Sequence, residues 1–313
     1  MKLIVASLLL ACAIAPARAE EFELKDGDKV VWLGSTLIER EQRYGYWETA
    51  LTARWPDRKM TFRNLGWSGD NVYGEARLGF DINTPALGLK RMVDLTLAEK
   101  PTVIFICYGQ NESFDGEAGL AKFVKGYEKL LDELKPAKAR IVLMTPLPFI
   151  SCPPMLPDAT AANKRLDGYA HVVRTIAERR QLPVADLFVT AGTEDSANRT
   201  ENGLHLTELG YARTARFVWR ALGLPDLPGP PPADAKMKIE QLRQAIIEKN
   251  KLYFYRWRPQ NETYLFGFRK KEQGKNAKEI AEFDPLIEKA EAEIDRLKKP
   301  RTHKYELVPA EKK

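Results

Sequence analysis

The chain has few of the residues that most often bind metals or form cross-links. Its 313 residues include three cysteines and three histidines. After a predicted N-terminal leader, the cysteines that remain are Cys107 and Cys152, and their spacing matches no zinc-binding pattern. We therefore expect no metal site. The two thiols are compatible with either a disulfide or a buried free Cys107, and the sequence does not decide between these states.

The signatures of nucleotide and nucleic-acid binding are also missing. No Gly-x-Gly-x-x-Gly follows a predicted strand, and no phosphate loop, zinc finger or helix-turn-helix pattern occurs. The formal charge is +6, and residues 233–313 hold 20 Lys and Arg against 14 Asp and Glu. This pattern is typical of solvated helix faces. We expect no cofactor and no nucleic-acid partner.

Long apolar runs are confined to the N-terminus. Lys2 precedes an apolar stretch from Leu3 to Ala15, and Ala17–Ala19 has the small residues of a signal-peptidase site. We predict that residues 1–19 are a signal peptide and that the protein is exported to the periplasm or secreted. Leu9–Cys12 loosely resembles a lipoprotein motif, which we favour less because the apolar run continues past it. No later segment is expected to cross a membrane.

Short apolar runs alternate with stretches of helical periodicity along the chain. This alternation favours an α/β fold with a parallel sheet covered on both faces, a three-layer flavodoxin-like arrangement with ligands at the carboxyl ends of the strands. The predicted strands are 29–33, 60–65, 102–107, 140–145 and 182–187, and the predicted helices are 44–55, 85–99, 117–135, 159–180 and 207–222.

A proline-rich stretch, residues 225–233, predicts a linker after a core domain of residues 20–224. Residues 234–313 then contain two charged helical patterns, which predict a C-terminal helical hairpin. Between them, residues 253–269 interleave aromatic and arginine side chains. We expect these aromatics to dock the hairpin onto the core rather than to form a sugar-binding platform.

Four predicted strand ends or loops place polar groups at one edge of the sheet. They are Gly34-Ser35-Thr36, the segment Gly66–Asp70 with Gly69, the segment Gly109–Glu112 with Asn111, and Asn202-Gly203-Leu204-His205. Acyl transfer needs a hydroxyl nucleophile, an imidazole base, a group that orients the base, and donors for the oxyanion. The four blocks supply these residue types.

In this order the blocks resemble those of SGNH (GDSL-type) hydrolases, over about residues 28–222. The resemblance implies ester hydrolysis without a cofactor. It implies that Ser35 or Thr36 attacks, His205 is the base, Asn202 orients it, and Gly69 and Asn111 bind the oxyanion. The implied substrate is a small ester or an acylated, especially acetylated, polysaccharide. The sequence does not reveal the oligomeric state.

Two departures from the family pattern bear on activity. Gly34-Ser35-Thr36 replaces Gly-Asp-Ser; anchoring on Gly34 puts Thr36 at the nucleophile position, whereas a shift by one residue puts Ser35 there. Asn202 replaces the aspartate of Asp-x-x-His, and an asparagine orients the imidazole through its side-chain oxygen without a charge. A non-catalytic glycan-binding or scaffold module derived from such a hydrolase is the alternative hypothesis.

Overall fold

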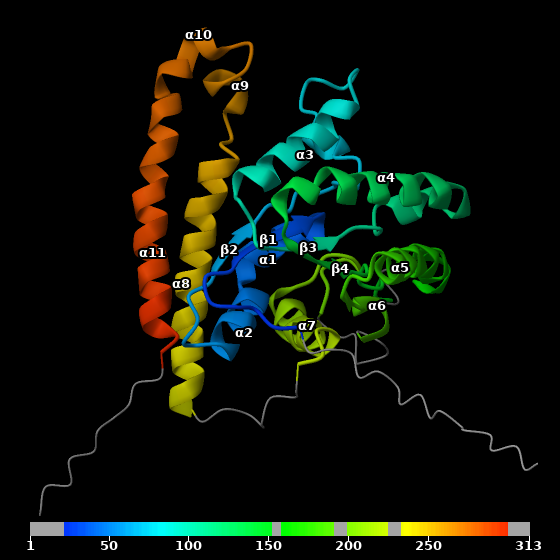
Figure 1. The fold of residues 1–313 in the computed structure, drawn as a ribbon, viewed down its shortest axis with the longest axis horizontal. Coiled ribbons are helices and arrows are strands. Elements are labelled where there is room, and N and C mark those ends of the chain that lie inside the picture. The colour runs from blue at the N-terminus through cyan, green and yellow to red at the C-terminus, as the bar shows by residue number, and fades with distance from the viewer. Residues whose placement is uncertain (1–21, 152–157, 191–198, 225–232, 300–313) are drawn as a thin grey trace, which may run out of the picture.

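A computed structural model describes residues 22–151, 158–190, 199–224 and 233–299. The predicted signal peptide, Cys152 and most of the predicted linker lie outside these residues. The sheet has five parallel strands, as the sequence predicts, and their order is β2-β1-β3-β4-β5 (Figure 1). The strands are β1 (Lys29–Gly34), β2 (Thr61–Asn64), β3 (Val103–Cys107), β4 (Arg140–Met144) and β5 (Val184–Ala185).

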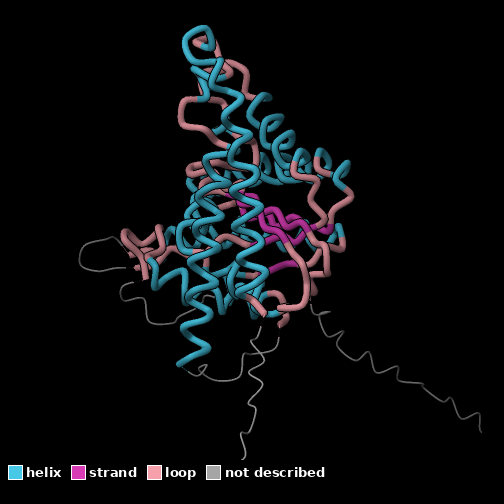
Figure 2. The backbone as a smooth tube through the Cα atoms, turned by 90° about the vertical axis from the view of Figure 1, so that its left-hand side faces the viewer, coloured by secondary structure: helices cyan, strands magenta, loops and turns pink. Residues whose placement is uncertain are grey.

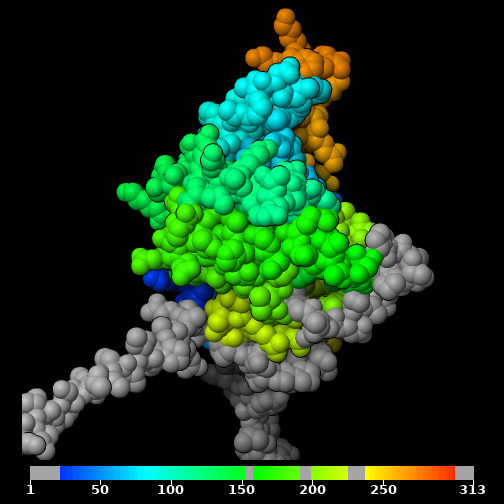
Figure 3. Space-filling model, turned by 90° about the vertical axis from the view of Figure 1, so that its right-hand side faces the viewer, coloured from blue at the N-terminus to red at the C-terminus, as the bar shows by residue number. Residues whose placement is uncertain are grey.

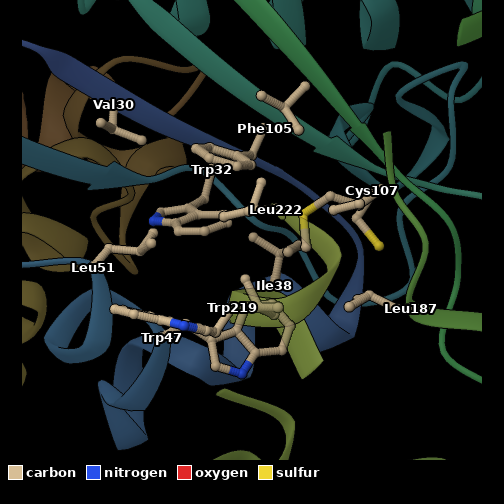
Figure 4. Packing of buried hydrophobic residues seen from close by; sticks show 14 of the residues in the cluster. Val30, Trp32, Ile38, Trp47, Leu51, Phe105, Cys107, Leu187, Trp219 and Leu222 are labelled. Carbon is tan, nitrogen blue, oxygen red and sulfur yellow. The ribbon is translucent and has the colours of Figure 1, made fainter. Parts of the chain in front are cut away.

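Helices cover both faces of the sheet because its strands are apolar on both sides. Trp32 and Phe105 stack at 4.4 Å between ring centroids and pack with α1, α2 and α7, as Figure 4 shows. Val31 and Ile104 point to the opposite face and pack with α3, α4 and α5. The core helices are α1 (Thr36–Tyr44), α2 (Tyr46–Arg54), α3 (Ala86–Ala98), α4 (Leu120–Glu133), α5 (Thr160–Arg180), α6 (Leu187–Thr190) and α7 (Glu208–Ala221), with 3₁₀ turns η1 (Glu75–Arg77), η2 (Glu112–Asp115), η3 (Glu117–Gly119) and η4 (Lys135–Ala137).

The first helical region differs from the prediction. Residues 36–54 form two helices, α1 and α2, separated by Gly45 at φ +66°, rather than one helix over 44–55. The apolar pattern misses α1 because this helix buries Glu39 and Glu41. The Glu41 carboxylate accepts hydrogen bonds from the first backbone N–H groups of α2, at Trp47 and Glu48. Burial raises the pKa of Glu41 to about 8.

The predicted C-terminal hairpin is present, and we call residues 233–299 the tail. Its long helices α8 (Ala233–Trp257) and α11 (Phe283–Leu297) run side by side along the β2 edge of the sheet (Figure 2). They are joined by α9 (Glu262–Leu265), α10 (Lys270–Gln273) and the 3₁₀ stretch η5 (Gly274–Glu282). Within the described residues, no helix is both long enough and apolar enough to span a membrane.

The aromatic side chains of the tail divide between two environments. Tyr253 is buried in the same cluster as the core helices, which agrees with docking. Phe266 and Phe268 are exposed at the tip of the tail, where Phe268 meets Phe80 edge-to-face. Figure 3 shows this tip beside the segment that precedes α3. The docking prediction therefore holds for Tyr253, whereas Phe266 and Phe268 stay largely exposed although Phe268 touches Phe80 of the core.

Candidate active site

Thr36 is the first residue of α1, directly after the carboxyl end of β1. The carbonyl of Ser35 accepts the N–H groups of Ile38 and Glu39, so Ser35 caps the helix through its backbone. Ser35 is 4% exposed, whereas Thr36 is partly exposed. The Thr36 Oγ1 accepts a hydrogen bond from the backbone N–H of Gly69, with an N···O distance of 3.1 Å. Of the two adjacent hydroxyls, the structure brings that of Thr36 to the Gly69 donor.

The segment Gly66–Asp70 is held tightly against β1 and α1. A Cβ at residue 66 would lie 2.3 Å from the backbone nitrogen of Glu39, so only glycine fits there. The Trp67 N–H donates to the Gly34 carbonyl at 3.0 Å, and Gly69 has a φ of +76°. This conformation turns the Gly69 N–H toward Thr36.

Asn111 reaches the same segment from the end of β3. Its Nδ2 donates to the carbonyl of Asp70 at 2.6 Å. The neighbouring Glu112 is buried and accepts N–H groups from Val72 and Gly109, each at 2.9 Å. Burial raises the pKa of Glu112 to about 7. Asn111 and Glu112 thus link the segment after β2 to the segment after β3.

Beneath these segments lies an ion pair between Asp70 and Arg77, whose side chains are both fully buried. The Arg77 Nε is 2.7 Å from the carboxylate, and the hydroxyl of Tyr108 donates to the same oxygen at 3.2 Å. Removing one member of such a pair leaves an uncompensated buried charge. The pair therefore fixes the backbone that follows Gly69.

His205 approaches from the loop before α7. Arg40 lies one turn after Thr36 on α1 and forms a salt bridge with Glu201 at 2.5 Å; it also contacts the Leu206 carbonyl at 3.5 Å. These contacts hold the His205 loop against the face of α1 that carries Thr36. Partial burial and the nearby Arg40 charge lower the pKa of His205, while Glu201 acts in the opposite direction. The imidazole therefore stays neutral to a lower pH than an ordinary histidine.

The side-chain amide of Asn202 has a fixed orientation. Its oxygen accepts the backbone N–H groups of Leu204 and His205 at 3.2 and 2.8 Å. Because backbone N–H groups only donate, the amide nitrogen must point the other way, and it lies 3.3 Å from His205 Nδ1. The sequence-based expectation that Asn202 orients the ring through its oxygen is corrected here: that oxygen is occupied by the backbone.

This orientation selects a tautomer of His205. A donor facing Nδ1 favours the form in which Nδ1 carries the lone pair and Nε2 carries the proton. An aspartate at position 202 would accept a hydrogen bond from Nδ1–H and so leave Nε2 unprotonated and free to act as a base. The arrangement therefore holds the imidazole in place but disfavours its basic form.

Residues 28–213 match the model of the GDSL-like lipase/acylhydrolase family, which is more than half of the chain. The chain belongs to this family. One similar solved structure is a catalytic mutant of Axe2, an acetylxylan esterase from Geobacillus stearothermophilus, with 19% identity, a TM-score of 0.51, and coverage of 67% of this chain and 100% of that one. Another is a gut microbial diltiazem-metabolizing enzyme, with 12% identity, a TM-score of 0.62, and coverage of 89% and 97%. These identities show a shared fold alone, and no curated protein matches the sequence significantly.

Within this GDSL-like chain, the predicted residues fall into two groups. Thr36, Gly69 and Asn111 are joined through hydrogen bonds to one short segment, and Asn202 and His205 form a second group tied to α1 by Arg40. Ser35 is buried and caps α1 through its backbone carbonyl. Cys107 is a free, buried thiol that faces the Thr145 carbonyl, and burial raises its pKa to about 12.

Sequence reasoning missed two residues that arrange the site, Glu39 and Arg40. Both lie in α1, which the apolar pattern did not reveal as a helix. The spacing from Thr36 to Arg40 is one helical turn, and this signal becomes visible once α1 is placed correctly.

Proposed function

We propose that the protein is an exported ester hydrolase that removes acyl groups, acetyl above all, from a carbohydrate or a small ester, with Thr36 as nucleophile. The observation that carries the proposal is the 3.1 Å hydrogen bond between the Gly69 N–H and Thr36 Oγ1. It puts a partly exposed hydroxyl beside a backbone donor, at the edge of the sheet where such folds bind ligands.

The proposed reaction has two halves. Thr36 Oγ attacks the ester carbonyl carbon while its proton passes to His205 Nε2, and the leaving alcohol takes that proton as its bond to the acyl carbon breaks. Water then attacks the acyl-threonine by the reverse proton route and releases the carboxylic acid. Gly69 N–H and the second N–H of the Asn111 amide stabilise the oxyanion; losing one such donor typically costs about 10²–10³-fold in kcat.

The Asn202 orientation makes this reaction slower than in a site with an aspartate. His205 must first move to the tautomer with a free Nε2, against the donor that faces Nδ1. The Thr36 methyl group adds a second restraint because it limits rotation about χ1. We therefore propose a hydrolase of modest turnover.

The carbohydrate substrate is supported by two indirect observations. One similar structure is that of an acetylxylan esterase, and the N-terminal sequence has the pattern of a signal peptide. Export would bring the protein to polysaccharides outside the cytoplasm. Both observations concern substrate class and place of action, and neither bears on the identity of the nucleophile.

The Asn202 orientation also favours a second candidate, a glycan-binding module that has lost its catalytic function. The two candidates differ in turnover. If this candidate were correct, the protein would bind acetylated xylan without releasing acetate.

The test is acetate release from acetylated xylan and from p-nitrophenyl acetate. Thr36→Ala and Ser35→Ala are a matched pair, because each removes one of two adjacent hydroxyls. We expect wild-type turnover that is lost in Thr36→Ala and in His205→Ala and retained in folded Ser35→Ala. Turnover that survives in Thr36→Ala and disappears in Ser35→Ala would transfer the role to Ser35. Absence of wild-type turnover on both esters would contradict the proposal.

A further inference from the structure

One residue of the tail makes direct contact with the proposed catalytic apparatus. Arg258 follows the end of α8, and its Nη1 lies 2.7 Å from Glu39 Oε2 in α1. Its guanidinium carbon lies 3.5 Å from the ring centroid of Trp67, so the planar cation stacks on the indole. Both partners are core residues: Glu39 lies in α1, which begins at Thr36, and Trp67 lies in the segment that carries Gly69.

Glu39 connects this contact to the Gly69 segment. Its Oε2 also accepts the backbone N–H of Ser68 at 2.7 Å, and its Oε1 accepts the Ser68 hydroxyl at 2.9 Å. Both donors of Ser68 are thus bound to the carboxylate that pairs with Arg258. Ser68 lies between Trp67 and Gly69. The contacts of Arg258 with Glu39 and Trp67 therefore restrict the backbone on both sides of Ser68.

The environment makes the contact stronger than an ordinary surface ion pair. The side chains of Glu39 and Arg258 are 8% and 25% exposed, and Trp257 packs edge-to-face on Trp67 with centroids 5.9 Å apart. Partial exclusion of water strengthens both the ion pair and the cation–π contact. Removing the guanidinium would leave the largely buried Glu39 carboxylate without its cationic partner in the tail.

We propose that Arg258 is a positioning residue through which the tail sets the Gly69 N–H relative to Thr36, by way of Glu39, Trp67 and Ser68. Its kinetic consequence rests on the proposed ester hydrolysis, whereas its effect on the order of the Gly69 segment does not. The tail is therefore part of the site, although it contributes no group to the reaction itself.

The first arm of the test is kinetic. Arg258→Gln removes the charge, and Arg256→Gln is the matched control, because Arg256 lies two residues away and pairs with Asp284 inside the tail at 2.9 Å. We expect kcat to fall by about 10- to 100-fold in Arg258→Gln, since misplacing a reacting group by 1 Å costs about 10²-fold. KM should change by less than about threefold in both variants, and kcat of the control should stay within about twofold of wild type.

Two further variants separate positioning from a general loss of folding. Arg258→Lys keeps the charge but not the planar stack, and should recover part of the lost kcat. Glu39→Gln should lower kcat as well, and combining it with Arg258→Gln should add little, because both changes break the same contact. Additive losses in the double variant, or equal losses in Arg256→Gln and Arg258→Gln, would overturn the proposal.

The second arm needs no activity. Amide hydrogen exchange by mass spectrometry on a peptide spanning residues 66–71 should be faster in Arg258→Gln than in wild type and Arg256→Gln. Unchanged exchange in that peptide would overturn the positioning role even in an active enzyme. If wild-type protein releases no acetate but exchange accelerates as expected, ester hydrolysis fails and the positioning of the segment stands.

Discussion

At the scale of single residues, Asn202 controls the protonation pattern of His205. Its oxygen is held by two backbone N–H groups, so its amide nitrogen faces Nδ1. In Asn202→Asp, we expect one carboxylate oxygen to keep the backbone contacts and the other to accept a hydrogen bond from Nδ1–H. Removing only this charge from a serine triad costs about 10⁴-fold in turnover. We therefore expect Asn202→Asp to raise kcat by at least about tenfold, measured as acetate release.

Asn163→Asp is a suitable control for that experiment. Asn163 also holds a loop backbone, with both polar groups bound to Phe149 at 2.8 Å, but it lies in α5. The same change of charge there should not raise turnover. An unchanged or lower kcat in folded Asn202→Asp would show that the His205 tautomer does not limit the reaction.

At the same scale, the protonation of His205 predicts how kcat/KM depends on pH. Burial and Arg40 lower the pKa of His205, so the neutral base persists to lower pH than for an ordinary histidine, and kcat/KM should rise with pH as the ring loses its proton. Arg40→Gln removes the positive charge and leaves Glu201 unopposed. We expect the acid limb of the pH profile to move to higher pH in this variant. Arg43→Gln, exposed on the same helix, should leave the limb in place; a shift of equal size there would contradict the assignment.

Much of the site was predictable at this scale, and its fine orientation was not. Thr36, Gly69 and Asn111 were named as candidates because a parallel sheet places its strand ends at one edge, and His205 was named from the loop before the last core helix. The Asn202 orientation depends on where two backbone N–H groups point, and residue identity does not encode that locally. The sequence also did not show that the Gly69 N–H lies at the hydroxyl of Thr36, because this contact depends on the three-dimensional position of that backbone group.

At the scale of elements, a buried ion pair joins α8 of the tail to α2 of the core. Lys249 Nζ lies 2.8 Å from Glu48 and donates to the Phe62 carbonyl at 3.0 Å, and both charged side chains are buried. Desolvation lowers the pKa of Lys249 and raises the pKa of Glu48. The pair thus places two ions in a low-dielectric interior, where each needs the other.

Lys249→Met should therefore lower the free energy of unfolding by about 3–5 kcal/mol, because it leaves the Glu48 carboxylate buried without its cation. Replacing both residues, as Glu48→Leu with Lys249→Met, should recover most of that loss. Denaturant unfolding measures both effects, and Lys251→Met, at an exposed position of α8, is the control. Equal stability of Lys249→Met and Lys251→Met would contradict the proposed docking role.

The strands and most helices were predictable as elements because their apolar patterns are strong. The helix α1 was not, since it buries acidic side chains that bind backbone N–H groups. The sequence predicted that aromatic side chains dock the tail, but it did not reveal the polar contacts that join the tail to the core. These contacts include the pair of Glu48 and Lys249, which are 201 residues apart in the chain.

At the scale of the whole molecule, the tail packs against the core beside the candidate site. The family match ends at residue 213, yet one similar structure covers 89% of this chain, more than residues 22–224 supply. The shared fold therefore includes part of the tail. Arg258 and Lys249 of the tail contact Glu39 in α1 and Glu48 in α2, and α1 begins with the proposed nucleophile, Thr36.

The most direct measurement is the site of covalent labelling by a fluorophosphonate, mapped by mass spectrometry on the mature protein. An activated hydroxyl beside an oxyanion donor should react, so we predict an adduct on Thr36 that is absent in His205→Ala. An adduct on Ser35 would contradict the assignment of the nucleophile. In folded protein, no adduct on either residue would contradict the account of an active hydrolase and favour a glycan-binding module.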